Sequence, residues 1–204
     1  MTPGQWFARL VTTAVVRVPA LWRVFRRPLT RNFDRLAPEW DATRVHEVSL
    51  GAMRAALDGV ERPPRSALDL GTGSGAVARL VAARWPDANV IGADVSPEMV
   101  SEARRLATTA KQRYDVADAS RLPYSDGAFD LVTMNNMIPF FDELARVTAP
   151  GGRVAVSYSR GAETPIWVPL KRVQAELQRR NFSHVATFSS GPGLSLLAHK
   201  DTRA

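Results

Sequence analysis

The 204-residue sequence contains no cysteine. That absence excludes a disulfide-stapled scaffold, a thiolate zinc site and a cysteine nucleophile. It agrees with a cytoplasmic location, which we expect for this chain. With 45% hydrophobic and 23% charged residues, the sequence has the composition of one globular domain with a sizeable core and an extension.

Acidic residues are absent from the start of the sequence, where Asp34 is the first acid. Six of the seven net positive charges therefore lie before it, on Arg9, Arg17, Arg23, Arg26, Arg27 and Arg31. A protein that binds nucleic acid over its surface spreads its positive charge more widely. We therefore expect no nucleic-acid partner.

The same segment has the pattern of an amphipathic helix. Apolar side chains recur at spacings of three and four, which places them on one arc of a helix: Phe7, Leu10, Val11, Ala14, Val18, Leu21, Trp22 and Phe25. Each arginine near a membrane centre would cost roughly 2.5–3.5 kcal/mol, so we do not expect this helix to span a bilayer. Pro19 would also kink it. Three interpretations of residues 5–27 stay open: a helix on an anionic membrane surface, a lid over the domain, and an organellar targeting segment.

From residue 66 onward, short apolar runs alternate with helical patterns, as in a parallel α/β sheet. Strands are predicted over 66–71, 89–94, 112–118, 129–135 and 151–159, with a closing pair over 184–190 and 194–200. Helices are predicted over 76–84, 97–107, 140–150 and 170–180. Gly191-Pro192-Gly193 separates the last two strands, which we expect to form an antiparallel hairpin. The linker "DGVERPPR" divides an N-terminal helical extension, residues 1–62, from a domain of residues 63–204.

The stretch "SALDLGTGSGAVARLV", residues 66–81, places a glycine-rich turn between a strand and a helix. Glycines permit a tight turn and close backbone approach in front of a helix N-terminus. Read as Gly71-x-Gly73-x-x-Ala76, the turn fits a nicotinamide dinucleotide. Read as "DLGTGSG", it resembles the loop that holds S-adenosylmethionine in methyltransferases. Asp94, at the end of the second strand, is placed to accept hydrogen bonds from the ribose hydroxyls of either ligand, so these two features leave both open.

Later segments of the sequence distinguish between these two possible ligands. "DVADASRLPYSDGAFDLV" places Asp118 directly after the third strand, "FDLVTMNN" contains the fourth strand, and "ELARVTAPGGRVAVS" follows. In this order, from about residue 33 to residue 200, the sequence resembles the class I, S-adenosylmethionine-dependent methyltransferases of the small-molecule type, including the quinone and sterol branch. The resemblance implies an α/β, Rossmann-like fold: a seven-stranded, mostly parallel sheet with a terminal antiparallel hairpin, preceded by the N-terminal helical extension.

The resemblance also implies which residues hold S-adenosylmethionine. They follow the ends of the first four strands: Asp69, Gly71, Thr72, Gly73, Asp94, Val95, Met99, Asp118, Ala119 and Asn135. In the family the first four line the methionine end, the next three meet the ribose and adenine, and the pair after the third strand meets the adenine edge. Asn135 would face the reacting methyl group. Phe33 and Trp40 would close over the cofactor.

The acceptor side departs from the family's pattern. Many relatives have a histidine or an aromatic cluster after the fourth strand, where this chain has "NNMIPFF" and a shortened connection. The side chains there favour a small, apolar or lipid-like acceptor: Met134, Met137, Ile138, Phe140 and Phe141. The Asp/Asn-Pro-Pro-aromatic motif of amino-directed DNA methyltransferases is missing.

A sulfonium methyl is already activated, so the main requirement is in-line placement of a nucleophile in a dry pocket, with a general base for some acceptors. The candidates for a catalytic role are Asn135 and His46, and no metal is expected. His184 and His199 fall on the terminal hairpin, where we expect them to be structural.

Two other functions stay open. One is an NAD(P)-dependent oxidoreductase, for which a Tyr-x-x-x-Lys site is missing because Ala162 stands four residues after Tyr158. The other is a catalytically silent module that binds the cofactor or docks on a membrane.

Overall fold

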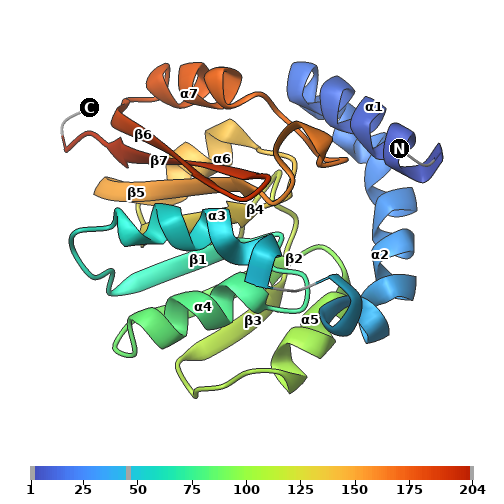
Figure 1. The fold of residues 1–204 in the computed structure, drawn as a ribbon, viewed down its shortest axis with the longest axis horizontal. Coiled ribbons are helices and arrows are strands. Elements are labelled where there is room, and N and C mark those ends of the chain that lie inside the picture. The colour runs from blue at the N-terminus through green and yellow to red at the C-terminus, as the bar shows by residue number, and fades with distance from the viewer. Residues whose placement is uncertain (1–2, 45–46, 203–204) are drawn as a thin grey trace.

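The computed structural model describes residues 3–44 and 47–202. A central sheet carries helices on both faces (Figure 1). Its strands are β1 (Ser66–Leu70), β2 (Asn89–Asp94), β3 (Gln112–Val116), β4 (Phe129–Asn135), β5 (Thr148–Tyr158), β6 (Phe182–Ser190) and β7 (Gly193–Lys200). The α-helices are α1 (Pro3–Arg17), α2 (Trp22–Arg44), α3 (Glu47–Asp58), α4 (Ala76–Arg84), α5 (Pro97–Arg105), α6 (Phe141–Val147) and α7 (Leu170–Gln178). Two short 3-10 helices, η1 (Pro19–Leu21) and η2 (Gly161–Glu163), complete the secondary structure of these residues.

The strand order in the sheet is β3-β2-β1-β4-β5-β7-β6. Strands β1 to β5 pair in parallel with one another, whereas β7 pairs antiparallel with both β5 and β6. The predicted fold class, a seven-stranded and mostly parallel sheet with an antiparallel hairpin at its end, is therefore confirmed. The apolar strands β1 and β4 lie in the interior of the sheet, as expected for strands covered by helices on both faces.

Each face of the sheet has its own apolar cluster, which packs the helices against the strands. One joins α3, α4 and α5 to the sheet through buried side chains such as Met53, Val81 and Val100. The other joins α6 and α7 to the opposite face and extends to Val11 and Trp22 near the N-terminus. We call α1, η1 and α2 together the cap. Figure 1 shows α1 beside α7 and α2 beside α5, so the cap runs from one side of the sheet to the other.

The predicted apolar arc of the first helix is divided in the structure. Helix α1 ends at Arg17, because Val18 leaves the helical region with φ −134° and Pro19 opens η1. The apolar residues therefore do not lie on one continuous helix, and the break falls at Pro19, where the sequence predicts a kink. Val11 and Trp22 are buried, whereas Leu10 and Val18 face outward.

The helix predicted over residues 140–150 was too long. Helix α6 ends at Val147, and β5 begins at Thr148 and runs through Pro150. The pairing of β5 with β4 shifts register here, because the segment between Thr148 and Arg153 bulges opposite Asp130. Proline lacks a backbone N–H and is tolerated at such a bulge, so Pro150 did not mark the end of the helix.

Candidate functional site

The carboxyl ends of β1, β2 and β4 meet at the middle of the sheet, because β1 lies between the other two. Ligands of open α/β sheets bind at this reversal of chain order. The loop that leaves β1 turns on Gly71, Gly73 and Gly75, which have positive φ values of 63°, 53° and 85°. Only glycine adopts such values at little cost. The amides of Gly71 and Thr72 donate to the carbonyl oxygen of Ala93 at 2.8 and 3.1 Å, which ties the glycine loop to β2.

Asp69 lies beneath the glycine loop, with 2% of its surface exposed. Its carboxylate accepts hydrogen bonds from the hydroxyls of Thr72, at 2.6 Å, and Thr133, at 2.8 Å. Burial raises the pKa of Asp69 to about 6, although both hydrogen bonds act in the opposite direction. Asp69 therefore joins the glycine loop to β4 from below.

Asp94 ends β2 and joins two loops. Its Oδ2 accepts from the Gly73 amide and its Oδ1 from the Ser96 amide, both at 2.9 Å. Burial raises the pKa of Asp94 against the effect of these hydrogen bonds. Each carboxylate oxygen can accept a further hydrogen bond, so a pair of ribose hydroxyls fits this group. Val95 is partly buried against the apolar core, and Met99 is buried.

Asp118, after β3, already accepts four hydrogen bonds from protein groups. Its Oδ1 accepts from the indole Nε1 of Trp22 at 2.8 Å, and from the amide and hydroxyl of Ser120 at 2.9 and 2.7 Å. Its Oδ2 accepts from the Arg26 guanidinium at 2.7 Å. Burial disfavours the ionised form, but the hydrogen bonds from Arg26, Ser120 and Trp22 outweigh it and lower the pKa of Asp118. Two cap residues therefore bind the carboxylate that is expected to meet the adenine edge. The next residue, Ala119, is buried.

Helix α2 makes polar contacts with the other two loops of this edge. Asp34 accepts a hydrogen bond from the Ser96 hydroxyl at 2.5 Å. Asp41 accepts one from the Ser74 hydroxyl at 2.9 Å and pairs with Arg79 at 2.6 Å. The cap therefore closes over the loops that follow β1, β2 and β3.

Two aromatic residues of α2 lie near the glycine loop. Phe33 and Trp40 pack edge to face with ring centroids 5.7 Å apart. A Cβ atom added at Gly73 would lie 3.5 Å from Nε1 of Trp40, so the indole lies against that part of the loop. This is the place where the sequence predicts that the pair closes over a cofactor.

Among the buried polar atoms without a hydrogen-bond partner in the described residues, two lie on a pair of opposite residues at the ends of β4 and β5. They are Oδ1 of Asn135 and Oγ of Ser157, whose residues are register partners in the sheet. A buried polar group without a partner is costly and calls for a water or ligand group. Sequence reasoning selected Asn135 but missed Ser157. The available signal was a serine interrupting the apolar run "VAVSYS".

The segment "NNMIPFF" forms an apolar wall between the glycine loop and the cap. A Cβ added at Gly71 would lie 2.7 Å from Sδ of Met137, so the thioether packs on the bare glycine backbone. Ile138, Phe140 and Phe141 are each at most 8% exposed. The ring of Phe140 meets that of Trp22 edge to face at 5.5 Å.

The two histidines that the structure describes, His184 and His199, lie away from this edge. His46 lies outside the described residues. His199 pairs with Arg153 near the start of the regular β4–β5 pairing, at the end of the sheet opposite to the glycine loop, and its ring lies 6.1 Å from that of His184. Within residues 3–44 and 47–202, no three His, Cys, Asp or Glu side chains are arranged to hold a metal ion.

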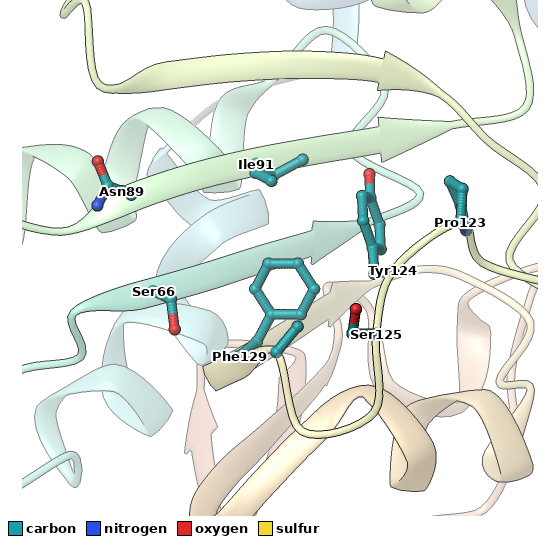
Figure 2. A pocket seen from close by; sticks show the side chains of 8 residues that line it. Ser66, Asn89, Ile91, Pro123, Tyr124, Ser125 and Phe129 are labelled. Atoms are coloured by element: carbon teal, nitrogen blue, oxygen red, sulfur yellow. The ribbon is translucent and has the colours of Figure 1, made fainter.

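A surface hollow of about 370 Å³ lies elsewhere on the sheet (Figure 2). Ser66 and Asn89, which open β1 and β2, line it together with Tyr124 and Phe129. It is therefore at the amino ends of the strands and is separate from the glycine loop.

Comparisons with known proteins agree with the geometry of this edge. The sequence profile of a family described as a methyltransferase domain matches residues 67–152. A demethylmenaquinone methyltransferase of Thermus thermophilus is 41% identical over 138 residues, which cover 61% of this chain and 62% of that protein. A trans-aconitate 2-methyltransferase of Methylobacterium nodulans is 35% identical over 146 residues, covering 68% of this chain and 57% of that protein.

The fold also has relatives among solved structures. A structure of a complex between the Haloferax volcanii Trm112 methyltransferase activator and a putative methyltransferase matches with a TM-score of 0.68 at 18% identity, covering 83% of this chain and 97% of that chain. At this identity the likeness concerns the fold alone. The two curated relatives match over about 60% of their own length. The expected resemblance is confirmed, and the nicotinamide alternative receives no support from these relatives.

Proposed function

The chain carries a methyltransferase domain of the class I, S-adenosylmethionine-dependent type, and from this premise we propose that it transfers a methyl group to a small, apolar or lipid-like acceptor. The observation that carries the proposal is the position of Asp94. Its carboxylate joins the glycine loop to the loop after β2 and retains acceptor capacity at the point where chain order reverses.

Bound S-adenosylmethionine supplies a methyl group on a positively charged sulfur. In our proposal Asp94 holds the ribose, and the glycine loop lets the ligand approach the backbone. Asp69 keeps that loop in place through Thr72. The unpartnered oxygens of Asn135 and Ser157 orient the reacting groups.

Placement and exclusion of water are the contributions we assign to the remaining residues. Met137 and Phe140 form the apolar side of the site, and α2 closes it. The relatives carry the names of quinone, aconitate and acyl-carrier-protein methyltransferases, so they do not select one acceptor. The apolar wall favours the quinone-like or lipid-like class.

The rest of the proposal concerns organisation and location. We divide the chain into an extension of residues 1–62 and a methyltransferase domain of residues 63–204, with α3 of the extension packed on β5, β6 and β7. None of the described helices is long and apolar enough to cross a bilayer. We propose a cytoplasmic enzyme that reaches a membrane peripherally through residues 5–27.

Calorimetry with S-adenosylhomocysteine, NAD and NADP tests the cofactor. We expect S-adenosylhomocysteine to bind and the two dinucleotides to give no heat of binding, because the relatives that match this chain are named as methyltransferases. Binding of NAD without any response to S-adenosylhomocysteine would overturn the proposal. Incubation with methyl-labelled S-adenosylmethionine and a quinone and lipid extract then separates an enzyme, which labels an extract component, from a silent module, which labels none.

A further inference from the structure

The cap has two faces with different chemistry. Its inner face buries Val11, Val15 and Trp22 against the domain. Arg9 fixes this face by donating hydrogen bonds to the carbonyl oxygens of Ala162 and Thr164 at 2.6 and 2.7 Å. The orientation of the cap is therefore set, and the side chains on its other side are turned to solvent.

The outer face of the cap, which is its solvent side, exposes large apolar side chains. Of the six large hydrophobic side chains that are exposed among the described residues, five belong to the cap: Trp6, Phe7, Leu10, Val18 and Val24. Trp6 is 58% exposed and Leu10 65%. A cluster of such side chains on one face marks an interaction site, whereas single exposed apolar residues are ordinary.

Positive charge surrounds these apolar side chains. The exposed arginines of the cap that precede its first acid, Asp34, are Arg17, Arg23, Arg27 and Arg31. Within the described residues, none of these four arginines forms an ion pair. A helical surface with exposed tryptophan and leucine beside unpaired arginines is complementary to an anionic bilayer, whose phosphates attract the charges and whose interface accommodates the rings.

The cap also contacts Asp118, the residue that we expect to meet the adenine of the cofactor. The Trp22 indole is a planar ring that donates an N–H to Asp118, as the exocyclic amine of an adenine would, and Arg26 occupies the other carboxylate oxygen. Arg26 lies on α2 between the exposed Arg23 and Arg27, and 42% of its side chain is exposed. A lipid phosphate that attracts this part of the cap competes with Asp118 for Arg26.

We propose that the outer face of the cap docks on an anionic lipid bilayer and that docking loosens the contact of Trp22 and Arg26 with Asp118, which strengthens cofactor binding. The linkage rests on the proposed methyltransferase function, whereas the docking surface, which deepens the proposed membrane contact of residues 5–27, can be tested without any cofactor. Because linkage is reciprocal, S-adenosylhomocysteine should strengthen vesicle binding by the same factor.

Flotation with vesicles of equal parts phosphatidylglycerol and phosphatidylcholine tests the surface without any cofactor. We expect the full chain to float at low salt and to be released by high salt, and not to float with phosphatidylcholine alone.

The double variant Trp6→Ser/Leu10→Ser should bind about tenfold more weakly, and so should Arg17→Gln/Arg23→Gln. The matched controls are Val116→Ser, at the large hydrophobic side chain that is exposed outside the cap among the described residues, and Arg62→Gln/Arg65→Gln, at two exposed arginines next to β1. Failure of the full chain to float at low salt overturns the docking proposal, as does equal flotation of all variants. If the full chain does not float but forms a dimer that Trp6→Ser/Leu10→Ser abolishes, the outer face contacts a second copy of the chain, and the docking proposal is overturned.

Calorimetry with S-adenosylhomocysteine, with and without the anionic vesicles, tests the linkage. We expect saturating vesicles to lower the Kd at least threefold. Arg26→Gln should lower it without vesicles and reduce the vesicle effect, and Trp22→Phe, which keeps an aromatic ring but removes the N–H, should act in the same direction. An unchanged or higher Kd with vesicles, or weaker binding by Arg26→Gln, overturns the linkage. If S-adenosylhomocysteine does not bind at all, the proposed function fails while the flotation result stands by itself.

Discussion

Replacement of Asp94 by alanine is expected to weaken the binding of S-adenosylhomocysteine about a hundredfold. In our proposal the carboxylate accepts both ribose hydroxyls, and it also fixes the amides of Gly73 and Ser96. Two charge-assisted hydrogen bonds at about 1.5 kcal/mol each amount to about 3 kcal/mol, or roughly two factors of ten in Kd. Calorimetry at constant pH and salt gives the number directly.

Asp130 offers a matched control for this variant. Its carboxylate also accepts two backbone amides, those of Arg65 and Ser66 at 2.9 and 3.1 Å, but it lies at the opposite end of the sheet. Asp130→Ala should lower thermal stability by an amount comparable to Asp94→Ala and leave the Kd within twofold of the parent. A Kd for Asp94→Ala that stays within threefold of the parent would mean that the ribose is held elsewhere.

The second large effect is a dependence of stability on pH that traces to Asp69. Its pKa of about 6 in the folded protein lies above its ordinary value of 3.8 because the carboxyl is buried. The folded state therefore binds this proton more tightly than the unfolded state, so ionisation costs stability as pH rises from about 4 to about 6. At about 1.4 kcal/mol per pKa unit, the full cost above pH 6 is about 3 kcal/mol.

The Asp69→Asn variant avoids this ionisation. The free energy of unfolding of the variant, minus that of the parent, should rise by about 3 kcal/mol between pH 4 and pH 7. Urea unfolding at several pH values measures the difference, and the other titrating groups largely cancel because both proteins share them. Asp87→Asn, which alters a fully exposed carboxylate, serves as the surface control in the same measurement. A flat difference for Asp69→Asn would show that its carboxyl titrates normally in the folded state.

The sheet is predictable from the sequence because its central strands are short apolar runs bounded by turn residues. The bounds of β2 and β4, and of α4 between β1 and β2, agree with the prediction at both ends. The boundary between α6 and β5 was not predictable from Pro150, because the bulge that tolerates it depends on pairing with β4. Local patterns decide buried strands, whereas tertiary pairing decides where an irregular strand starts.

The contacts between the cap and the rest of the site could not be predicted from sequence patterns. Pro19 predicts the break between α1 and α2, but the amphipathic pattern does not indicate that Leu10 and Val18 face outward while Val11 and Trp22 are buried. The bond from Trp22 to Asp118 joins residues 96 positions apart, and nothing in either sequence neighbourhood selects the other. The cofactor residues, by contrast, follow strand ends and are placed by the fold, and their roles stay predictions.

The position of β7 has a consequence for synthesis of the chain. Residues 182–190 leave the ribosome before residues 193–200, yet β7 lies between β5 and β6. Until β7 emerges, β5 is an open edge whose Val154 and Val156 belong to the core. Exposed apolar edges of nascent chains invite pairing with other chains, and they close only as fast as a hairpin can form and insert. We expect the nascent protein to need protection by chaperones during this interval, and a pause in translation between β6 and β7 to lower the yield of folded protein.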